Sequence, residues 1–185
     1  MKAYERLLKY VVVRTPSDEN SETVPSSQCQ FDLARLLKDE MEGLGLTDVV
    51  LDDQCYLYGK LPATPGYEDK TSIGFIAHMD TVSDFCDQDI HPVITENYNG
   101  EDLPLGDSGL ILSTETFPHL KDLKRRTLIT TDGHTILGAD DKAGIAEILT
   151  LIEILNETKM PHGPISVAFT PDEEIGTGAS HFNVE

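Results

Sequence analysis

Two adjacent aspartates, Asp140 and Asp141, stand in the segment GADDKAG at residues 138–144. Apolar residues at three- and four-residue spacing follow, which predicts a helix over residues 141–156. The aspartates therefore stand where free backbone N–H groups and the helix dipole favour negative charge. Either one is a good N-cap, and Lys142 is interpreted as a solvated or locally paired charge. Asp140 also offers two oxygens that can bridge two cations about 3.5–4 Å apart.

A histidine and an aspartate are separated by a single residue in the segment HMDT at residues 78–81. A carboxylate that accepts a hydrogen bond from one ring nitrogen fixes the tautomer and raises the basicity of the other nitrogen. His78 is thus a candidate metal ligand, and Asp80 is a candidate for orienting it. Taken alone, such a pair is more often a hydrogen-bonded surface pair, so a function requires further groups nearby.

Glu173 and Glu174 are adjacent in the segment FTPDEEIG at residues 169–176. Neighbouring side chains of an extended segment point in opposite directions, so one glutamate can bind a metal while the other faces the substrate. A glutamate that does not ligate the metal is a natural general base for an attacking water. The alternative is an acidic loop, but the apolar run before the pair and the glycines after it favour a shaped turn.

The elements around these segments alternate between strands and helices. A helix is expected over residues 3–13, with Leu7, Leu8, Val11 and Val12 facing inward. A second helix is expected to start near residues 25–27 and to end at the glycines at positions 43 and 45. Strands are expected over 49–51, 56–61, 72–77 and 165–169, and the unbroken apolar run 72–77 is typical of burial on both faces. This alternation predicts an α/β fold, a three-layer sandwich with a mostly parallel mixed sheet.

The candidate side chains lie just beyond predicted strand ends or at a helix start. Ligands bind in open sheets of this kind beyond the carboxyl ends of the strands. We therefore expect the three segments to meet at one edge of one sheet. Residues 82–126, which are acidic and rich in glycine and proline, are expected to form an irregular insertion with at most one helical turn near 113–120. Residues 128–131 and 135–137 flank Asp132-Gly133, which predicts a hairpin.

Composition limits the possible partners and compartment. The chain has 185 residues and a net charge of −19, which argues against nucleic acid and anionic membranes as partners. Its three cysteines lie far apart without a CxxC pair, so neither a disulfide framework nor a cysteine zinc site is expected. The N-terminus does not have the pattern of a signal peptide, and no apolar run approaches membrane-spanning length. We therefore expect a cytoplasmic protein.

The three segments, in this order, resemble the tripeptide aminopeptidases of the M20 dizinc metallopeptidase family. The resemblance extends to SDENSE at 17–22 and DLARLL at 32–37, and so covers nearly the whole chain. It implies that the protein is a hydrolase that removes the N-terminal residue from a small peptide. It also implies two Zn²⁺ ions in a complete active site, although His with carboxylates can bind other divalent metals.

The resemblance also implies a role for each candidate residue. His78 would bind one zinc ion, Asp140 would bridge both ions, and Glu174 would bind the other. Asp80 would orient His78. Glu173 would be the general base that takes a proton from the attacking water. A cis peptide bond between Asp140 and the residue after it would aim the bridging carboxylate.

The resemblance covers only part of the family pattern. The family takes one more carboxylate ligand, one more histidine ligand and a smaller lid domain from later sequence, so residues 1–185 would be the N-terminal portion of the catalytic domain. Each zinc ion would then keep two protein ligands, whereas catalytic zinc normally has three. We expect this chain alone to bind zinc weakly and to be nearly inactive. The alternatives are another M20-type amidohydrolase, such as a dipeptidase or deacylase, and a non-catalytic metal-binding domain.

Overall fold

The computed structural model describes residues 1–184 and divides into two compact units. The first unit comprises Met1–Ser83 and Gly138–Glu185, and the second comprises Asp84–Leu137. All three segments of interest belong to the first unit, because the second unit is an insertion between HMDT and GADDKAG. Each unit is described by itself below.

A four-stranded mixed sheet forms the centre of the first unit. Its strands lie in the order β1 (Thr47–Leu51), β2 (Leu57–Leu61), β8 (Ile165–Thr170) and β3 (Ile73–His78). The β1–β2 and β2–β8 pairs are antiparallel, and the β8–β3 pair is parallel. The expected strands and the mixed α/β character are confirmed. Only one of the three pairings is parallel, however, so the expectation of a mostly parallel sheet does not hold for the described strands.

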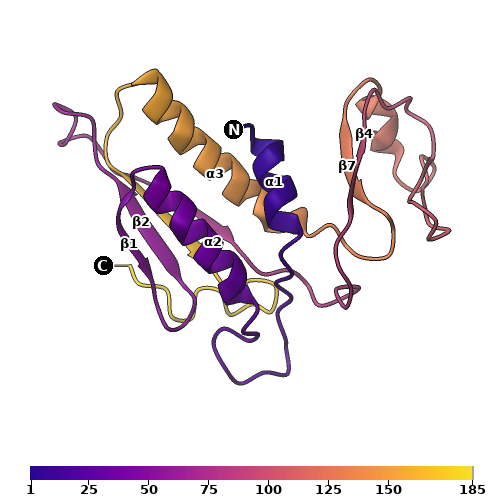
Figure 1. Cartoon of the computed structure of the whole chain (residues 1–185), viewed down its shortest axis with the longest axis horizontal. Coiled ribbons are helices and arrows are strands. Elements are labelled where there is room, and N and C mark those ends of the chain that lie inside the picture. The colour runs from indigo at the N-terminus through magenta and orange to yellow at the C-terminus, as the bar shows by residue number, and fades with distance from the viewer. Residues whose placement is uncertain (185) are drawn as a thin grey trace. The chain divides into compact units, whose positions relative to one another are not determined.

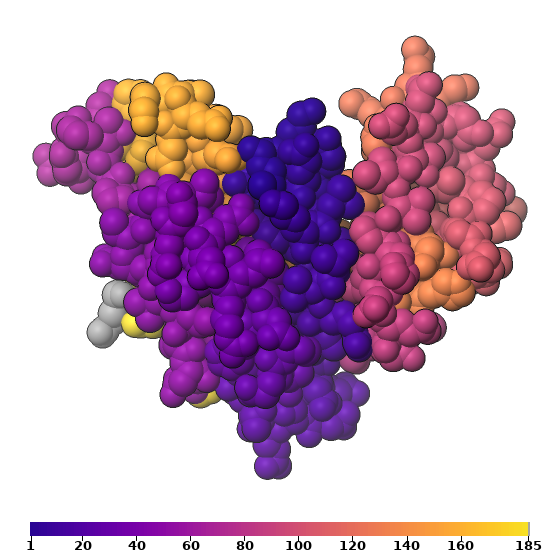
Figure 2. Space-filling view, viewed as in Figure 1, coloured from indigo at the N-terminus to yellow at the C-terminus, as the bar shows by residue number. Residues whose placement is uncertain are grey.

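Helices α2 (Gln30–Gly43) and α3 (Ala139–Thr158) pack on one face of this sheet, and α1 (Ala3–Val11) packs against α3, as Figure 1 shows. Their apolar positions recur every three or four residues, so each helix presents one buried stripe. On α3 this stripe consists of Ile145, Ile148, Leu149, Ile152 and Leu155. The stripe packs with Leu37 and Met41 of α2 and with inward-facing strand residues in one core. In the space-filling view the N-terminal residues, in dark colours, cover this side of the first unit (Figure 2).

The opposite face of the sheet is largely open in the described residues. On β3, Gly74 and Ile76 share this face, and both are exposed, Ile76 to 60%. The expectation that residues 72–77 are buried on both faces is therefore wrong for this structure. The physical reason is that β3 lies at the edge of the sheet, and no helix of residues 1–184 covers its second face. The described residues thus provide two of the three expected layers.

The second unit contains two short antiparallel strand pairs and a 3-10 helix of six residues, longer than the single turn expected near 113–120. β4 (Pro92–Thr95) pairs with β7 (Leu128–Thr131), β5 (Leu103–Pro104) pairs with β6 (Ile111–Leu112), and Pro118–Leu123 forms a 3-10 helix. The expected hairpin of 128–131 with 135–137 is wrong, because β4 occupies the pairing edge of β7. The chain after β7 instead forms a tight turn, in which the Thr131 hydroxyl accepts a hydrogen bond from Gly133 N and donates one to Thr135 O.

Two further expectations concern cysteines and membranes. The three cysteines form no disulfide bond with one another, and Cys55 and Cys86 are buried. None of the helices in residues 1–184 has the length and apolar character needed to cross a bilayer.

Candidate functional site

The carboxyl ends of β3 and β8 lie side by side because these two strands are parallel. His78, the last residue of β3, stands opposite Thr170, the last residue of β8. The pairing continues one step further, since Met79 N donates to Thr170 O at 2.8 Å. The HMDT segment and the turn that contains the two glutamates therefore leave the sheet next to each other, as the strand-end reasoning predicted.

Asp80 joins the two strand ends through its carboxylate. Its side chain is fully buried, and it accepts hydrogen bonds from Glu173 N at 2.9 Å and Glu174 N at 3.1 Å. One of its oxygens also lies 3.4 Å from His78 Nδ1. Asp80 thus contacts His78, as expected, and additionally holds the backbone of the turn that carries both glutamates.

The ring of His78 is oriented by these neighbours. Nδ1 donates to the carbonyl oxygen of Asp80 at 2.9 Å, since a carbonyl can only accept. Nε2 points toward Asp140 Oδ1 at 3.1 Å and lies 3.7 Å from Glu173 Oε2. Burial alone would lower the pKa of His78, but the Asp80 and Asp140 carboxylates outweigh it and raise the pKa to about 9.

Asp140 and Asp141 adopt different roles at the start of α3. Their backbone angles are non-helical, and the peptide bond between them is cis, as the family resemblance implied. Asp141 Oδ1 accepts from Gly144 N at 3.1 Å, which is the N-cap interaction of the regular helix that follows. The Asp140 side chain is 89% exposed and extends toward His78 instead. Asp141 therefore serves the helix, and Asp140 is available for chemistry.

The site contains more negative charge than it can balance. Carboxylate oxygens of Asp80, Asp140 and Glu173 lie within 3.7 Å of the His78 ring nitrogens, and the fourth carboxylate, that of Glu174, is close enough to interact electrostatically with all four of these residues. Partial burial raises the pKa of Glu174, as do the charges of the three other carboxylates, while His78 opposes the shift. The cluster therefore favours a bound cation.

Two buried charged residues lie close to the site, and the sequence patterns did not predict their burial. Lys142, interpreted above as a solvated or locally paired charge, is fully buried, and its Nζ donates to Val13 O at 2.7 Å. Asp172 is 1% exposed and accepts from Ser26 N at 2.8 Å and from Gln30 Nε2 at 2.7 Å. The signal that could have identified Lys142 is its position between small residues on a helix whose remaining stripe is apolar.

The donor atoms at this edge of the sheet fit a divalent metal in part. The 3.1 Å between His78 Nε2 and Asp140 Oδ1 is close to the spacing of two ligands on one zinc ion, whose bonds are about 2.0–2.1 Å long. The Nδ1 hydrogen bond leaves Nε2 free to bind a metal once its own proton is lost. Within residues 1–184, no group of three His, Cys, Asp or Glu side chains is arranged to hold a metal ion. The described residues thus provide an incomplete ligand set.

Comparisons with known proteins point to one family. Residues 129–183 match the profile described as Peptidase family M20/M25/M40. The chain is 52% identical to peptidase T of Alkaliphilus oremlandii over 185 residues, which are 98% of this chain and 45% of that protein. It is 50% identical to peptidase T of Escherichia coli K12, covering 100% of this chain and 45% of that protein. The chain thus spans a little under half the length of these relatives.

Solved structures agree with the sequence relatives. Aminopeptidase PepT from Bacillus cereus matches 98% of this chain and 39% of its own, with a TM-score of 0.66 and 28% identity. Aminoacylhistidine dipeptidase from Vibrio alginolyticus matches 97% of this chain and 29% of its own, with a TM-score of 0.60 and 27% identity. The fold described above is therefore shared with peptidases of more than one specificity.

Proposed function

We propose that this chain, which matches Peptidase family M20/M25/M40 over residues 129–183 and is similar to peptidase T over its whole length, forms the metal-binding part of an aminopeptidase that releases the N-terminal residue from tripeptides in the cytoplasm. The observation that carries the proposal is the approach of His78 Nε2 to Asp140 Oδ1 at 3.1 Å, within a cluster of four carboxylates. Such a cluster is poorly suited to bind an anion or nucleic acid and well suited to bind cations.

Each residue of the cluster has a role in this proposal. His78, Asp140 and Glu174 would hold Zn²⁺, and Asp140 would contribute to the binding of two ions. Asp80 fixes the His78 ring and the glutamate turn through the hydrogen bonds described above. Zinc bound here would polarise the scissile carbonyl and make water a stronger nucleophile near neutral pH.

Glu173 is the proposed general base. Its side chain is 58% exposed and lies 3.7 Å from His78 Nε2, so it can face a substrate and remain close to the metal ligands. In the reaction, Glu173 takes a proton from the water whose oxygen attacks the carbonyl carbon of the first peptide bond. It then gives that proton to the departing amine as the C–N bond breaks.

The 185-residue chain alone should bind zinc weakly, because its described residues bring His78 and Asp140 together without a third ligand. Calorimetric titration with Zn²⁺ and a tripeptide hydrolysis assay on this chain test the expectation. Tight, stoichiometric zinc binding with robust turnover would contradict it.

The identity of the substrate is tested in a full-length protein that contains this chain. The assay compares tripeptides, dipeptides and N-acylated amino acids at saturating Zn²⁺. The proposal expects the highest kcat/KM for tripeptides with a free N-terminus. Preference for dipeptides or acylated amino acids would favour the amidohydrolase alternative. Zinc binding without turnover of any class would favour a binding domain.

A further inference from the structure

We propose that Lys142 is a positioning residue that fixes Asp140 against His78 by tying the start of α3 to residues 13–17. The inference rests on the proposed function, because it assigns Lys142 to the alignment of two proposed metal ligands. Its evidence is a set of contacts in the first unit that join the two ligand-bearing elements to the same short segment.

Lys142 is a costly residue to bury, and its placement therefore requires compensation. The side chain has an exposed fraction of 0%, and its Nζ donates to Val13 O at 2.7 Å. An ammonium group removed from water retains its charge only where oxygen atoms or opposite charges replace the lost solvation. Since Lys142 lies two residues after Asp140, this contact fixes the first turn of α3 relative to the segment that follows α1.

The same segment holds the strand extension that carries the histidine. The Thr15 hydroxyl donates to Met79 O at 2.7 Å, and Thr81 N donates to Thr15 O at 3.0 Å. Ser17 N donates to Thr81 O at 3.0 Å, so the pairing continues beyond β3. These bonds place residues 13–17 alongside the extension of β3 that follows His78, and Thr15 and Ser17 are both buried.

Gly138 brings the two elements into direct contact. It has a left-handed φ of +68°, and a Cβ added there would lie 2.9 Å from Thr81 Cγ2. The backbone before Asp140 therefore packs directly against the Thr81 side chain on the extension of β3. Rotation of this turn is limited by Gly138 on one side and by the Lys142 contact on the other.

The consequence is that residues 13–17, called the bracket here, connect the two elements that carry the proposed metal ligands. Lys142 attaches the bracket to the element of Asp140, and Thr15 attaches it to the element of His78. Losing either attachment should let the two ligands separate from their 3.1 Å approach while the core below stays packed.

The experiment compares three variants of the 185-residue chain. Lys142→Met removes the ammonium group and keeps a long apolar stem, and Thr15→Val removes only the hydroxyl. Arg6→Met is the matched control, because Arg6 is also a buried cation on a helix that contacts α3, but its partners are Glu40, Thr150 and Glu153. The readouts are the melting temperature, the ring signals of His78 in NMR spectra at one fixed pH without metal, and the affinity for Co²⁺ from its absorption spectrum.

Lys142→Met is expected to shift the His78 ring signals and to weaken Co²⁺ binding about 10-fold or more, the range found for residues that orient metal ligands. Thr15→Val should move the same signals to a smaller extent. Arg6→Met should lower the melting temperature and leave the His78 signals and Co²⁺ affinity near those of the wild type. Unchanged His78 signals in Lys142→Met, or equal shifts in Arg6→Met, would overturn the inference.

Two other outcomes are also informative. If Lys142→Met does not fold, Thr15→Val provides the test. An unshifted His78 signal in that folded variant would overturn the inference that the bracket positions the two ligands. If the wild-type chain binds no Co²⁺, the proposed metal site is contradicted for this chain. The metal-free His78 signals still support the bracket when they shift as expected and contradict it when they do not.

Discussion

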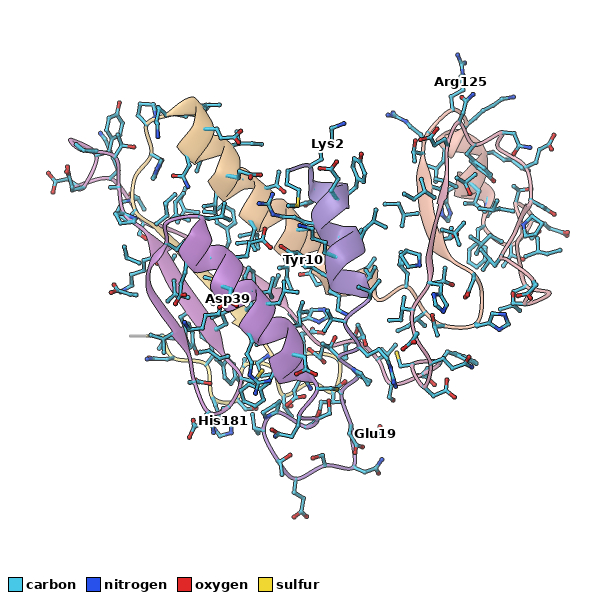
Figure 3. The ribbon with its side chains drawn as sticks, in the orientation of Figure 1. Lys2, Tyr10, Glu19, Asp39, Arg125 and His181 are labelled. Atoms are coloured by element: carbon cyan, nitrogen blue, oxygen red, sulfur yellow. The ribbon has the colours of Figure 1, made fainter. Side chains whose placement is uncertain are left out.

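Two clusters of charged side chains lie in the first unit, and they differ in how their charges are balanced. In the cluster around Arg6, the guanidinium donates to Glu40 at 2.7 Å and to Glu153 at 3.0 Å, and Tyr10 OH donates to Glu40 at 2.7 Å. The N-terminal ammonium group of Met1 also pairs with Glu153. Two cations thus meet two carboxylates. Figure 3 labels Tyr10, which lies on α1.

The candidate site has the opposite balance, with four carboxylates near one histidine. The Arg6 cluster has enough internal partners to be stable as it is, so we interpret it as structural. The site retains uncompensated negative charge at an accessible sheet edge, a feature that costs stability and persists where function requires it. The comparison therefore predicts that changes at the site affect chemistry, and changes at Arg6 affect stability.

The largest effect is expected for Glu173→Gln in a full-length protein that contains this chain. Loss of a general base should lower kcat by about 10²–10⁴-fold, while the melting temperature and zinc content stay near those of the wild type. Steady-state kinetics, thermal unfolding and metal analysis measure the three quantities. An unchanged kcat would show that another group takes the proton. It would also contradict the expectation that changes at the site affect chemistry.

The next largest effect is expected for Arg6→Met, which leaves two carboxylates without their shared cation. Arg6 is 1% exposed, but Glu40 and Glu153 are about one-fifth exposed and can be partly rehydrated. We therefore expect the free energy of unfolding to fall by about 3 kcal/mol, the lower end of the range for broken buried ion pairs. Urea unfolding measures this quantity. A loss below about 0.5 kcal/mol, typical of exposed pairs, would show that the Arg6 cluster is not a structural contact.

A smaller effect with a characteristic pH dependence is expected for Tyr10→Phe. Burial and the neighbouring Glu40 carboxylate raise the pKa of Tyr10 well above its usual value near 10. A raised folded-state pKa gives stability that is fully present below pH 10 and is lost as the pH rises toward the folded-state value. Tyr10→Phe should therefore cost about 0.5–1.5 kcal/mol between pH 7 and 9, and the difference should shrink above pH 10. Urea unfolding at several pH values measures the difference, and a cost that grows with pH would contradict this account.

The sequence was informative where structure depends on local patterns. The strands ending near His78 and before Glu173, and the helix after Asp141, follow from runs of apolar residues that need no distant partner to be recognised. Their meeting at one sheet edge then follows from the parallel pairing of β3 with β8. The roles of the individual residues in binding metal and moving protons remain predictions.

The sequence was less informative where structure depends on distant partners. The turn at Asp132-Gly133 predicted a local hairpin, but β7 pairs with β4, and a local turn signal contains no information about that competition. On α1, periodicity selected Val12 as buried, whereas Val12 is 49% exposed and Arg6 is buried. Arg6 enters the interior because Glu40 on α2 and Glu153 on α3 are there to pair with it, and neither is adjacent in sequence.

The smallest effect is expected at the site and should have the opposite sign. Burial and the charges of Asp80 and Asp140 raise the pKa of Glu174, so its ionised form opposes folding of the metal-free chain. Its favourable contribution exists only at acidic pH and is lost as the pH rises through the folded-state pKa.

Glu174→Gln should therefore stabilise the metal-free chain at pH 7 by about 0.2–1 kcal/mol, a range suited to partly exposed charges, and the gain should shrink below about pH 4.5. Urea unfolding in the presence of a chelator, at pH 7 and at pH 4, measures both values. Destabilisation by Glu174→Gln at pH 7 would mean that this carboxylate has a favourable partner within the chain. The site would then be balanced in the same way as the Arg6 cluster, and the charge imbalance that distinguishes the two would no longer support a bound cation.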